Sequence, residues 1–109
     1  MEALQVLADP VRLGIVESLA YEPASVGVLA ERFPISRPAV SRHLRLLKDA
    51  GLVDSVSDGT RRVYRVRPEG VAALREYMDA LWREASARYA LAAENLAENG
   101  AQSRIEDER

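Results

Sequence analysis

Residues 36–53 read SRPAVSRHLRLLKDAGLV, and this stretch predicts one short helix, over residues 36–50, with a defined beginning and end. Ser36 can accept a hydrogen bond from an amide of the first turn, and Pro38 lies inside that turn, where its missing N–H costs little. Gly51 can adopt the left-handed conformation that closes a helix. Apolar residues recur along one stripe of the predicted helix at Val40, Leu44 and Leu47.

The opposite face of this helix is small and polar at its beginning and cationic along its length. At about 100° per residue, the side chains that point away from the apolar stripe are Pro38, Ser41, Arg42 and Arg45. Small residues allow close approach to a DNA groove, hydroxyls bond phosphates or base edges, and arginine pairs bidentately with guanine. An ordinary amphipathic helix with a solvated basic face has the same pattern, so the neighbouring segments must decide.

Positive charge is concentrated around this helix, although the 109-residue chain has a net charge of −2. Residues 1–31 hold one basic and five acidic side chains, residues 32–67 hold nine and three, and residues 68–109 hold five and nine. The middle third therefore carries a net charge of +6 between two segments of −4 each. Chance clustering is the alternative, but this distribution favours an anionic partner for the middle segment.

Composition indicates a soluble globular protein, with 48% hydrophobic and 29% charged residues. The chain has no cysteine, which excludes disulfides, thiolate metal sites and a thiol nucleophile. No apolar run approaches the length of a membrane span, and Glu2 stands where a signal peptide would be basic. We therefore expect a cytoplasmic protein with no membrane partner.

Helices are also expected before residue 36. After a helical turn or two over residues 1–8, Asp9 and Pro10 provide an N-cap and a first helical position for a helix that continues to about Tyr21. Its broad apolar face comprises Val11, Leu13, Ile15, Val16 and Leu19. Ser25 caps a further helix over about residues 26–33, and Pro34 and Ile35 form the turn before residue 36. This succession is typical of a helix-turn-helix.

A hairpin is predicted after Gly51, where the hydrophobic period changes from 3.6 to 2. Residues 52–56 and 61–66 have the composition of strands, and the Asp-Gly pair in residues 57–60 favours a tight turn. Such a hairpin, over residues 53–66, is a wing, whose Arg61 and Arg62 could contact DNA phosphates or a narrow groove. A solvated edge strand protected by charge gives the same pattern.

A long helix is expected from about Glu69 to Asn99, ended by Gly100. Its apolar residues recur every three or four positions over a length of about 45 Å, more than a domain of this size can cover. A second copy of the same helix is the simplest partner, in a two-fold dimer. The predicted dimer interface comprises Leu4, Leu74, Met78, Leu81, Trp82, Ala85 and Tyr89. We expect one domain over residues 1–99 and a disordered tail over residues 100–109.

Three segments together resemble the ArsR (SmtB-like) winged helix-turn-helix repressors. These are residues 7–15 (LADPVRLGI), residues 36–53 with their SRPAVSRHL and AGLV sequences, and Gly59 before residues 61–64 (RRVY). The resemblance covers about residues 3–95. It implies a mainly α fold with a small β-hairpin, in the order α-α-α-α-β-β-α, and a homodimer that binds an imperfect palindrome in double-stranded promoter DNA.

The resemblance also implies which side chains face the DNA groove. In the family these correspond to Ser36, Arg37, Pro38, Ser41 and Arg42, with the wing arginines following by position. Arg45 joins them from the geometry of its helix. His43 lies at the edge between the two helix faces, where packing or a phosphate contact is its expected role.

The sequence departs from the family at its metal sites. No cysteine occurs near residues 28–31 and no histidine occurs in the last helix, where metal-sensing members carry ligands. Carboxylates of that helix (Glu76, Asp79, Glu84) are expected to be solvated. We therefore expect no metal or other cofactor, and an effector that is another ligand, a partner protein or absent.

The leading hypothesis is a sequence-specific transcriptional regulator, a repressor by family inference. A winged helix that binds protein would need an apolar recognition face, whereas this one is basic. An enzyme is not expected, because Ser41 and His43 do not face each other on a helix and the sequence has no phosphate-binding glycine loop.

Overall fold

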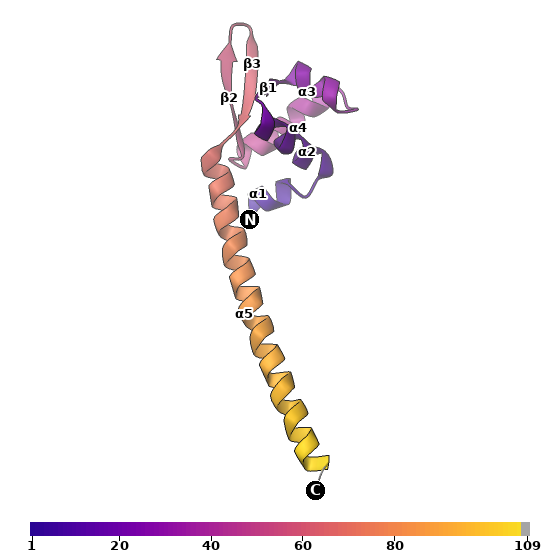
Figure 1. The fold of residues 1–109 in the computed structure, drawn as a ribbon. Helices are drawn as coiled ribbons and strands as arrows, with labels where there is room; N and C mark the ends of the chain where they lie inside the picture. The colour runs from indigo at the N-terminus through magenta and orange to yellow at the C-terminus, as the bar shows by residue number, and fades with distance from the viewer. Residues whose placement is uncertain (108–109) are drawn as a thin grey trace. The chain divides into compact units, whose positions relative to one another are not determined.

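A computed structural model describes the backbone of residues 1–107 and the side chains of residues 1–100. In chain order its elements are α1 (Glu2–Val6), α2 (Pro10–Tyr21), β1 (Ala24–Ser25), α3 (Val26–Arg32), α4 (Arg37–Asp49), β2 (Val53–Asp58), β3 (Arg61–Val66) and α5 (Pro68–Asp107) (Figure 1). They fall into two compact units, Met1–Leu74 and the part of the chain from Arg75 onward.

The predicted N-caps begin their helices in the structure. The Asp9 carboxylate accepts hydrogen bonds from the backbone N–H groups of Val11 (2.8 Å) and Arg12 (3.2 Å) at the start of α2. The hydroxyl of Ser36 accepts one from Ala39 (3.3 Å) at the start of α4. Each cap satisfies amide donors that the helix itself leaves without partners, which is why these short polar residues set the helix boundaries.

Gly51 ends α4 with the left-handed backbone that the sequence predicted, at a φ of 78°. Its N–H donates to the Lys48 carbonyl (3.0 Å), and the N–H of Leu52 donates to the Leu47 carbonyl (3.0 Å). This pair of bonds is a Schellman motif. Leu47 and Leu52, at the two ends of the second bond, are both buried in the core. The motif therefore holds the chain against the core as it passes from α4 into β2.

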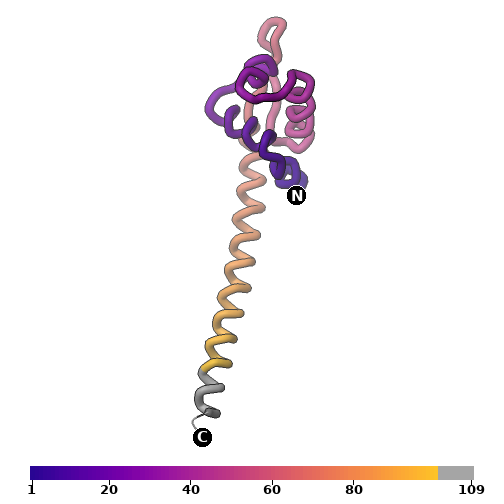
Figure 2. Tube along the Cα trace, turned by 90° about the vertical axis from the view of Figure 1, so that its right-hand side faces the viewer, coloured from indigo at the N-terminus to yellow at the C-terminus, as the bar shows by residue number. Residues whose placement is uncertain are grey.

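The hairpin of β2 and β3 projects from the helices of the first unit in both views (Figures 1 and 2). Its strands pair in register from Val53 opposite Val66 to Asp58 opposite Arg61. The turn is therefore shorter than the predicted residues 57–60, because only Gly59 and Thr60 lie outside the strands. Gly59 has a φ of 65°, as the first central position of a type II′ turn requires.

A third strand, β1, was not predicted. Ala24 pairs with Tyr64 and Ser25 with Val63, so the sheet has the order β1-β3-β2. The sequence had assigned Ser25 only to a helix cap. Two residues carry no periodicity, and their strand conformation depends on a partner about 40 positions away.

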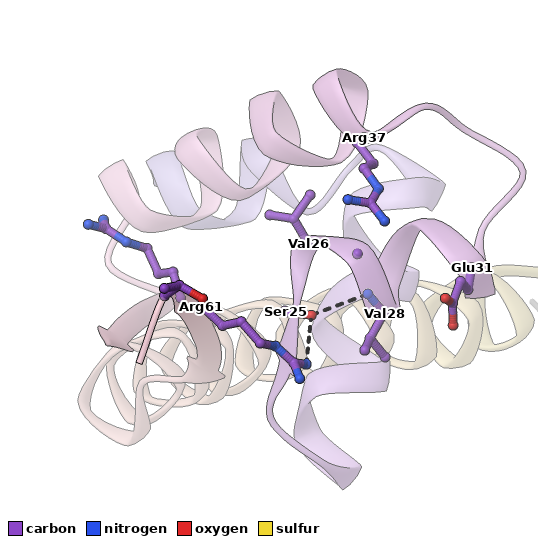
Figure 3. A pocket seen from close by; sticks show the side chains of 9 residues that line it. Ser25, Val26, Val28, Glu31, Arg37 and Arg61 are labelled. Atoms are coloured by element: carbon purple, nitrogen blue, oxygen red, sulfur yellow. Dashed lines mark hydrogen bonds between the residues drawn. The ribbon is translucent and has the colours of Figure 1, made fainter. Parts of the chain in front are cut away.

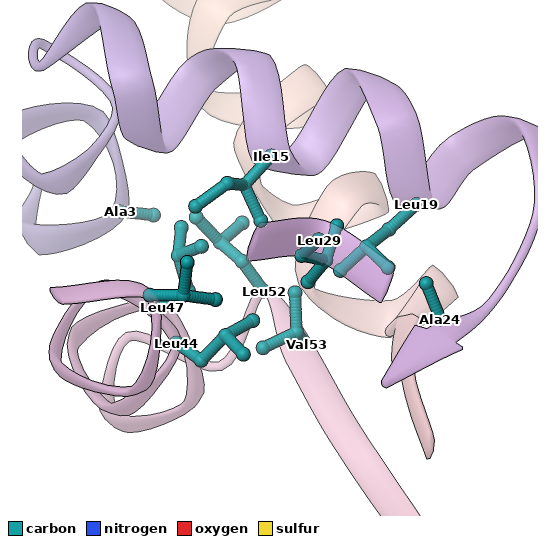
Figure 4. Close-up of a cluster of buried hydrophobic side chains, with 10 residues drawn as sticks. Ala3, Ile15, Leu19, Ala24, Leu29, Leu44, Leu47, Leu52 and Val53 are labelled. Carbon is teal, nitrogen blue, oxygen red and sulfur yellow. The ribbon is translucent and has the colours of Figure 1, made fainter. Parts of the chain in front are cut away.

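The core of the first unit lies between α2, α4 and the start of β2 (Figure 4). Ile15 of α2 and Leu29 of α3 meet the buried stripe of α4, which is Val40, Leu44 and Leu47 as predicted. Leu13 was wrongly assigned to the buried face, since 42% of it is exposed. At about 100° per residue Leu13 lies some 160° from Ile15, on the other side of α2.

Helix α5 begins at Pro68 and continues through Gly100 to Asp107, so the prediction that Gly100 ends it is wrong. Gly100 has no positive φ, unlike Gly51 and Gly59. A glycine costs a helix about 1 kcal/mol but ends it only when it turns left-handed. The tail that was predicted to be disordered comprises residues 100–109. Its side chains beyond residue 100, and the backbone of residues 108–109, lie outside the described residues.

The second unit is helical, and the described part of it, residues 75–100, is solvent-exposed throughout. This includes its large apolar side chains, among them Trp82 at 75% exposure and Tyr89 at 77%. Within the described residues, none of the helices combines the length and the hydropathy needed to cross a membrane.

Candidate nucleic-acid interface

Helix α4 separates its two faces as its sequence predicted. Val40, Leu44 and Leu47 are fully buried, and they hold the helix on the core. The residues predicted to contact DNA are exposed on the rest of the helix and at its cap: Ser36, Arg37, Pro38, Ser41, Arg42 and Arg45. The buried stripe therefore fixes which side of α4 a nucleic acid could reach.

The arginines of this exposed face carry charge that other side chains do not neutralise. Arg37, Arg42 and Arg45 form no ion pair with any described residue. By contrast, Arg65 of β3 lies opposite Asp54 in the sheet and donates to its carboxylate at 2.8 Å. That hydrogen bond, together with the charge of Asp54, raises the pKa of Arg65. The α4 arginines thus remain available to an outside anion.

Arg61 and Arg62, the two predicted wing contacts, are exposed at the start of β3. The Nη2 atom of Arg61 donates to the Ser25 hydroxyl at 3.3 Å. The same hydroxyl accepts from the backbone N–H of Val28 at 3.3 Å and so caps α3 (Figure 3). Ser25 therefore connects the wing to the first helix of the helix-turn-helix, in addition to the β1–β3 pairing.

A groove of about 630 Å³ lies between the starts of α3, α4 and β3. Figure 3 shows Arg37 and Arg61 directed toward the start of α3 from different elements. Three cations, Arg37, Arg61 and Arg62, line the groove with one carboxylate, Glu31. The groove therefore joins the predicted recognition helix and the predicted wing in one continuous cationic surface.

Gly27 lies in this groove beside Arg37. A Cβ atom at residue 27 would lie 3.3 Å from Nη2 of Arg37, closer than most side-chain contacts. Ser25, Gly27 and Val28 were not predicted to be part of the surface. Neither charge nor periodicity marks these residues, and their place depends on the pairing of β1 with β3.

The predicted dimer residues lie in both units. On α1, Leu4 is exposed, whereas Leu74 is half-buried and packs against the core of the first unit. In the second unit all the predicted residues are exposed: Met78, Leu81, Trp82, Ala85 and Tyr89. Three of them, with Ser86, line a mostly apolar hollow of about 390 Å³ on helix α5.

His43 is half-buried on α4, at the edge between the buried and exposed faces, where the sequence placed it. Its Nδ1 atom lies 3.4 Å from Nη1 of Arg12 in α2. Arg12 also contacts Asp9, whose pKa is lowered, first by the hydrogen bond from the Arg12 backbone N–H and further by Val11 and the nearby positive charges. His43 thus contacts another helix of its own unit.

Carboxylates of α5 do not form a metal site in the described residues. Glu84 is hydrogen-bonded to Arg88, and Asp79 lies 3.9 Å from Arg75. Over the described part of the chain, His, Cys, Asp and Glu side chains nowhere gather in groups of three that could hold a metal ion.

Comparisons with known proteins identify the family. A family profile described as a helix-turn-helix domain matches residues 7–56, from before α2 into β2. HTH-type transcriptional regulator Rv2034 of Mycobacterium tuberculosis is 53% identical over 88 residues, 81% of this chain and 82% of that protein. An ArsR-like transcriptional regulator from Rhodococcus sp. RHA1 superposes with a TM-score of 0.72 and 30% identity, over 82% of this chain and 84% of that one. The chain belongs to the ArsR family of transcriptional regulators.

A solved relative of this ArsR-family regulator supports the fold prediction. It is the homodimeric winged helix-turn-helix DNA-binding domain of Mb0332 from Mycobacterium bovis, a possible ArsR-family regulator. It superposes with a TM-score of 0.62 and 31% identity, over 76% of this chain and 77% of that one. The predicted fold class, a mainly α winged helix-turn-helix with a small hairpin, is confirmed, and so is the predicted class of function, transcriptional regulation.

Proposed function

We propose that this ArsR-family regulator is a cytoplasmic repressor that binds a palindromic operator as a homodimer. In this proposal α4 enters the major groove, and the wing of β2 and β3 lies over the adjacent backbone or minor groove. The single observation that carries it is the set of exposed arginines on α4, which form no ion pair with any described residue and lie opposite a fully buried stripe.

Each part of the cationic surface has a different role in the proposal. Arg42 and Ser41 lie on the exposed face of α4 and read base edges, because hydroxyls and guanidinium groups match the donors and acceptors of the major groove. The ends of the surface hold phosphates without reading sequence. These are Ser36 and Arg37 at the start of α4, Arg45 farther along it, and Arg61 and Arg62 on the wing; Pro38, which has no hydrogen-bond donor, allows close approach to the groove.

The homodimer in this proposal is formed by α1 and α5. Two features of the apolar side chains of α5 support their role as an interface. They are exposed, and they are regularly spaced: Met78, Trp82, Ala85 and Tyr89 recur at intervals of four, three and four residues. That repeat is typical of helices that pack along each other. The homodimeric Mb0332 domain is a second support. Two-fold symmetry would place two copies of α4 about 34 Å apart, one turn of DNA.

The proposal includes no metal effector. Residues 28–31 hold no cysteine, and the α5 segment holds no histidine, so the usual thiolate and imidazole ligands have no counterparts here. Release from DNA would then depend on another ligand or on a partner protein, or the regulator has no effector.

The first test is selection of bound duplexes from a random DNA library by the purified protein. A regulator that reads sequence enriches a motif with two-fold symmetry. Fluorescence anisotropy then compares the selected duplex with a shuffled duplex of the same composition. Equal binding of both duplexes by the wild-type protein would refute a sequence-reading function.

Substitution of the reading face gives the second test. Arg42→Ala is expected to lower the ratio of selected to shuffled binding by about 10- to 100-fold, since a good bidentate pair contributes about 1–3 kcal/mol of discrimination. Arg32→Ala is the matched control, because Arg32 is exposed in α3 and donates to Ser18 instead of facing outward from α4. Full discrimination by the Arg42 variant would show that another face reads the bases.

A further inference from the structure

Arg12 connects three helices of the first unit. It is the only basic residue in residues 1–31, and its side chain is 19% exposed. Its Nε atom donates to the Val6 carbonyl at 2.6 Å, and its Nη1 atom lies 3.8 Å from the Asp9 carboxylate. The same Nη1 atom lies 3.4 Å from Nδ1 of His43.

These three partners have distinct places in the fold. Val6 is the last residue of α1, where a helix leaves its carbonyls without internal partners. Asp9 is the N-cap of α2, and His43 lies midway along α4. Because α1 has only five residues, it cannot be stable alone and depends on such contacts. One guanidinium therefore lies where α1, α2 and α4 meet.

We propose that Arg12 is a positioning residue for DNA reading, which fixes α4 against α1 and the start of α2 through His43. The inference rests on the proposed function, in which α4 reads bases and α1 contributes to the dimer. In that arrangement Arg12 connects α1, which contributes to the dimer interface, with α4, which reads the bases. A guanidinium suits this role because its five N–H donors lie in a rigid fork, whereas a lysine ammonium is a single flexible point.

A loosened α4 should affect sequence discrimination more than overall affinity. Hydrogen bonds to base edges weaken steeply when distance or angle changes. Attraction to phosphates acts over about 8–10 Å at moderate salt and tolerates a small displacement of the helix. The readout is therefore the ratio of affinities for the selected and the shuffled duplex, and not affinity alone.

Three variants separate geometry from charge. Arg12→Met is expected to lower the discrimination ratio about tenfold. Arg12→Lys, which keeps the charge without the fork, should lower the ratio to a similar extent while binding the shuffled duplex as the wild type does. Arg32→Met is the matched control, since Arg32 donates to Ser18 of α2 at 2.8 Å and lies 3.8 Å from the carboxylate of Glu22, at the end of α2. An Arg12→Met ratio equal to that of Arg32→Met would overturn the inference.

Substitution of His43 tests the same contact from α4. Neutral His43 can accept a hydrogen bond at Nδ1, which lies 3.4 Å from Nη1 of Arg12. Asparagine keeps an acceptor at this place, whereas leucine has none.

His43→Asn, whose amide oxygen can still accept from Arg12, is therefore expected to keep the wild-type discrimination ratio, and His43→Leu to lower it about as much as Arg12→Met. A direct contact of His43 with phosphate predicts instead that His43→Leu lowers the affinity for both duplexes alike and leaves their ratio unchanged, and that result would overturn the inference.

Failure of this inference differs from failure of the proposed function. If the wild-type protein shows no preference for any selected duplex, the proposed function fails and the inference fails with it. If the wild type discriminates but Arg12→Met leaves the ratio unchanged, only the role of Arg12 is refuted. Circular dichroism melts of each variant identify a loss of folding, and if Arg12→Met does not fold, the two His43 variants decide.

Discussion

Replacing Trp82 by alanine is expected to weaken self-association of the chain by about three orders of magnitude. A tryptophan side chain offers up to about 250 Å², so the 75% of Trp82 that is exposed corresponds to roughly 190 Å². Covering half of that area contributes about 2.4 kcal/mol per protomer at about 25 cal/mol per Å², and about 5 kcal/mol over the two equivalent side chains of a two-fold dimer. Each 1.4 kcal/mol is about tenfold in the dissociation constant.

Sedimentation equilibrium over a wide range of protein concentrations measures this change. Tyr21→Ala is the matched control, because Tyr21 is 94% exposed but belongs to α2 and not to α5. The control should sediment like the wild type. If Trp82→Ala associates as strongly as the wild type, or if the wild type stays monomeric at micromolar concentration, the reasoning from the exposed α5 residues is wrong.

Three further predictions concern the wing, the core and a helix cap. Arg62→Ala should reduce the slope of log affinity against log salt by about 0.9, measured by anisotropy over a salt series, if Arg62 neutralises one phosphate. Leu44→Ala, at a fully buried residue, should lower the free energy of unfolding by about 2–5 kcal/mol in urea titrations. Asp9→Ala should lower the melting temperature at pH 7, and the difference in melting temperature between variant and wild type should narrow in acid. Folding lowers the pKa of Asp9, so its carboxylate stabilises the fold fully at pH values above the ordinary pKa of aspartate. This stabilisation is lost as the pH falls through the lowered pKa.

Elements that depend on neighbours in the chain could be predicted closely. Asp9, Ser25 and Ser36 begin their helices by accepting hydrogen bonds from amides two or three residues away, and Gly51 ends α4 by its own conformational freedom. The buried stripe of α4 follows from the 3.6-residue period alone. The exposed cationic face was predictable for the same reason, since the same period places its arginines on the side of α4 opposite the buried stripe.

The sequence by itself therefore determined the helix boundaries of the first unit, the hairpin and the side of α4 that carries the arginines, because cap, turn and period act over a few residues. Only the tertiary structure decided which distant groups meet. Ser25 joins Arg61 across 36 positions, and Arg12 reaches His43 across 31. No local pattern encodes such contacts, because they form only when the buried stripe of α4 and the pairing of β1 with β3 bring separate elements of the first unit together.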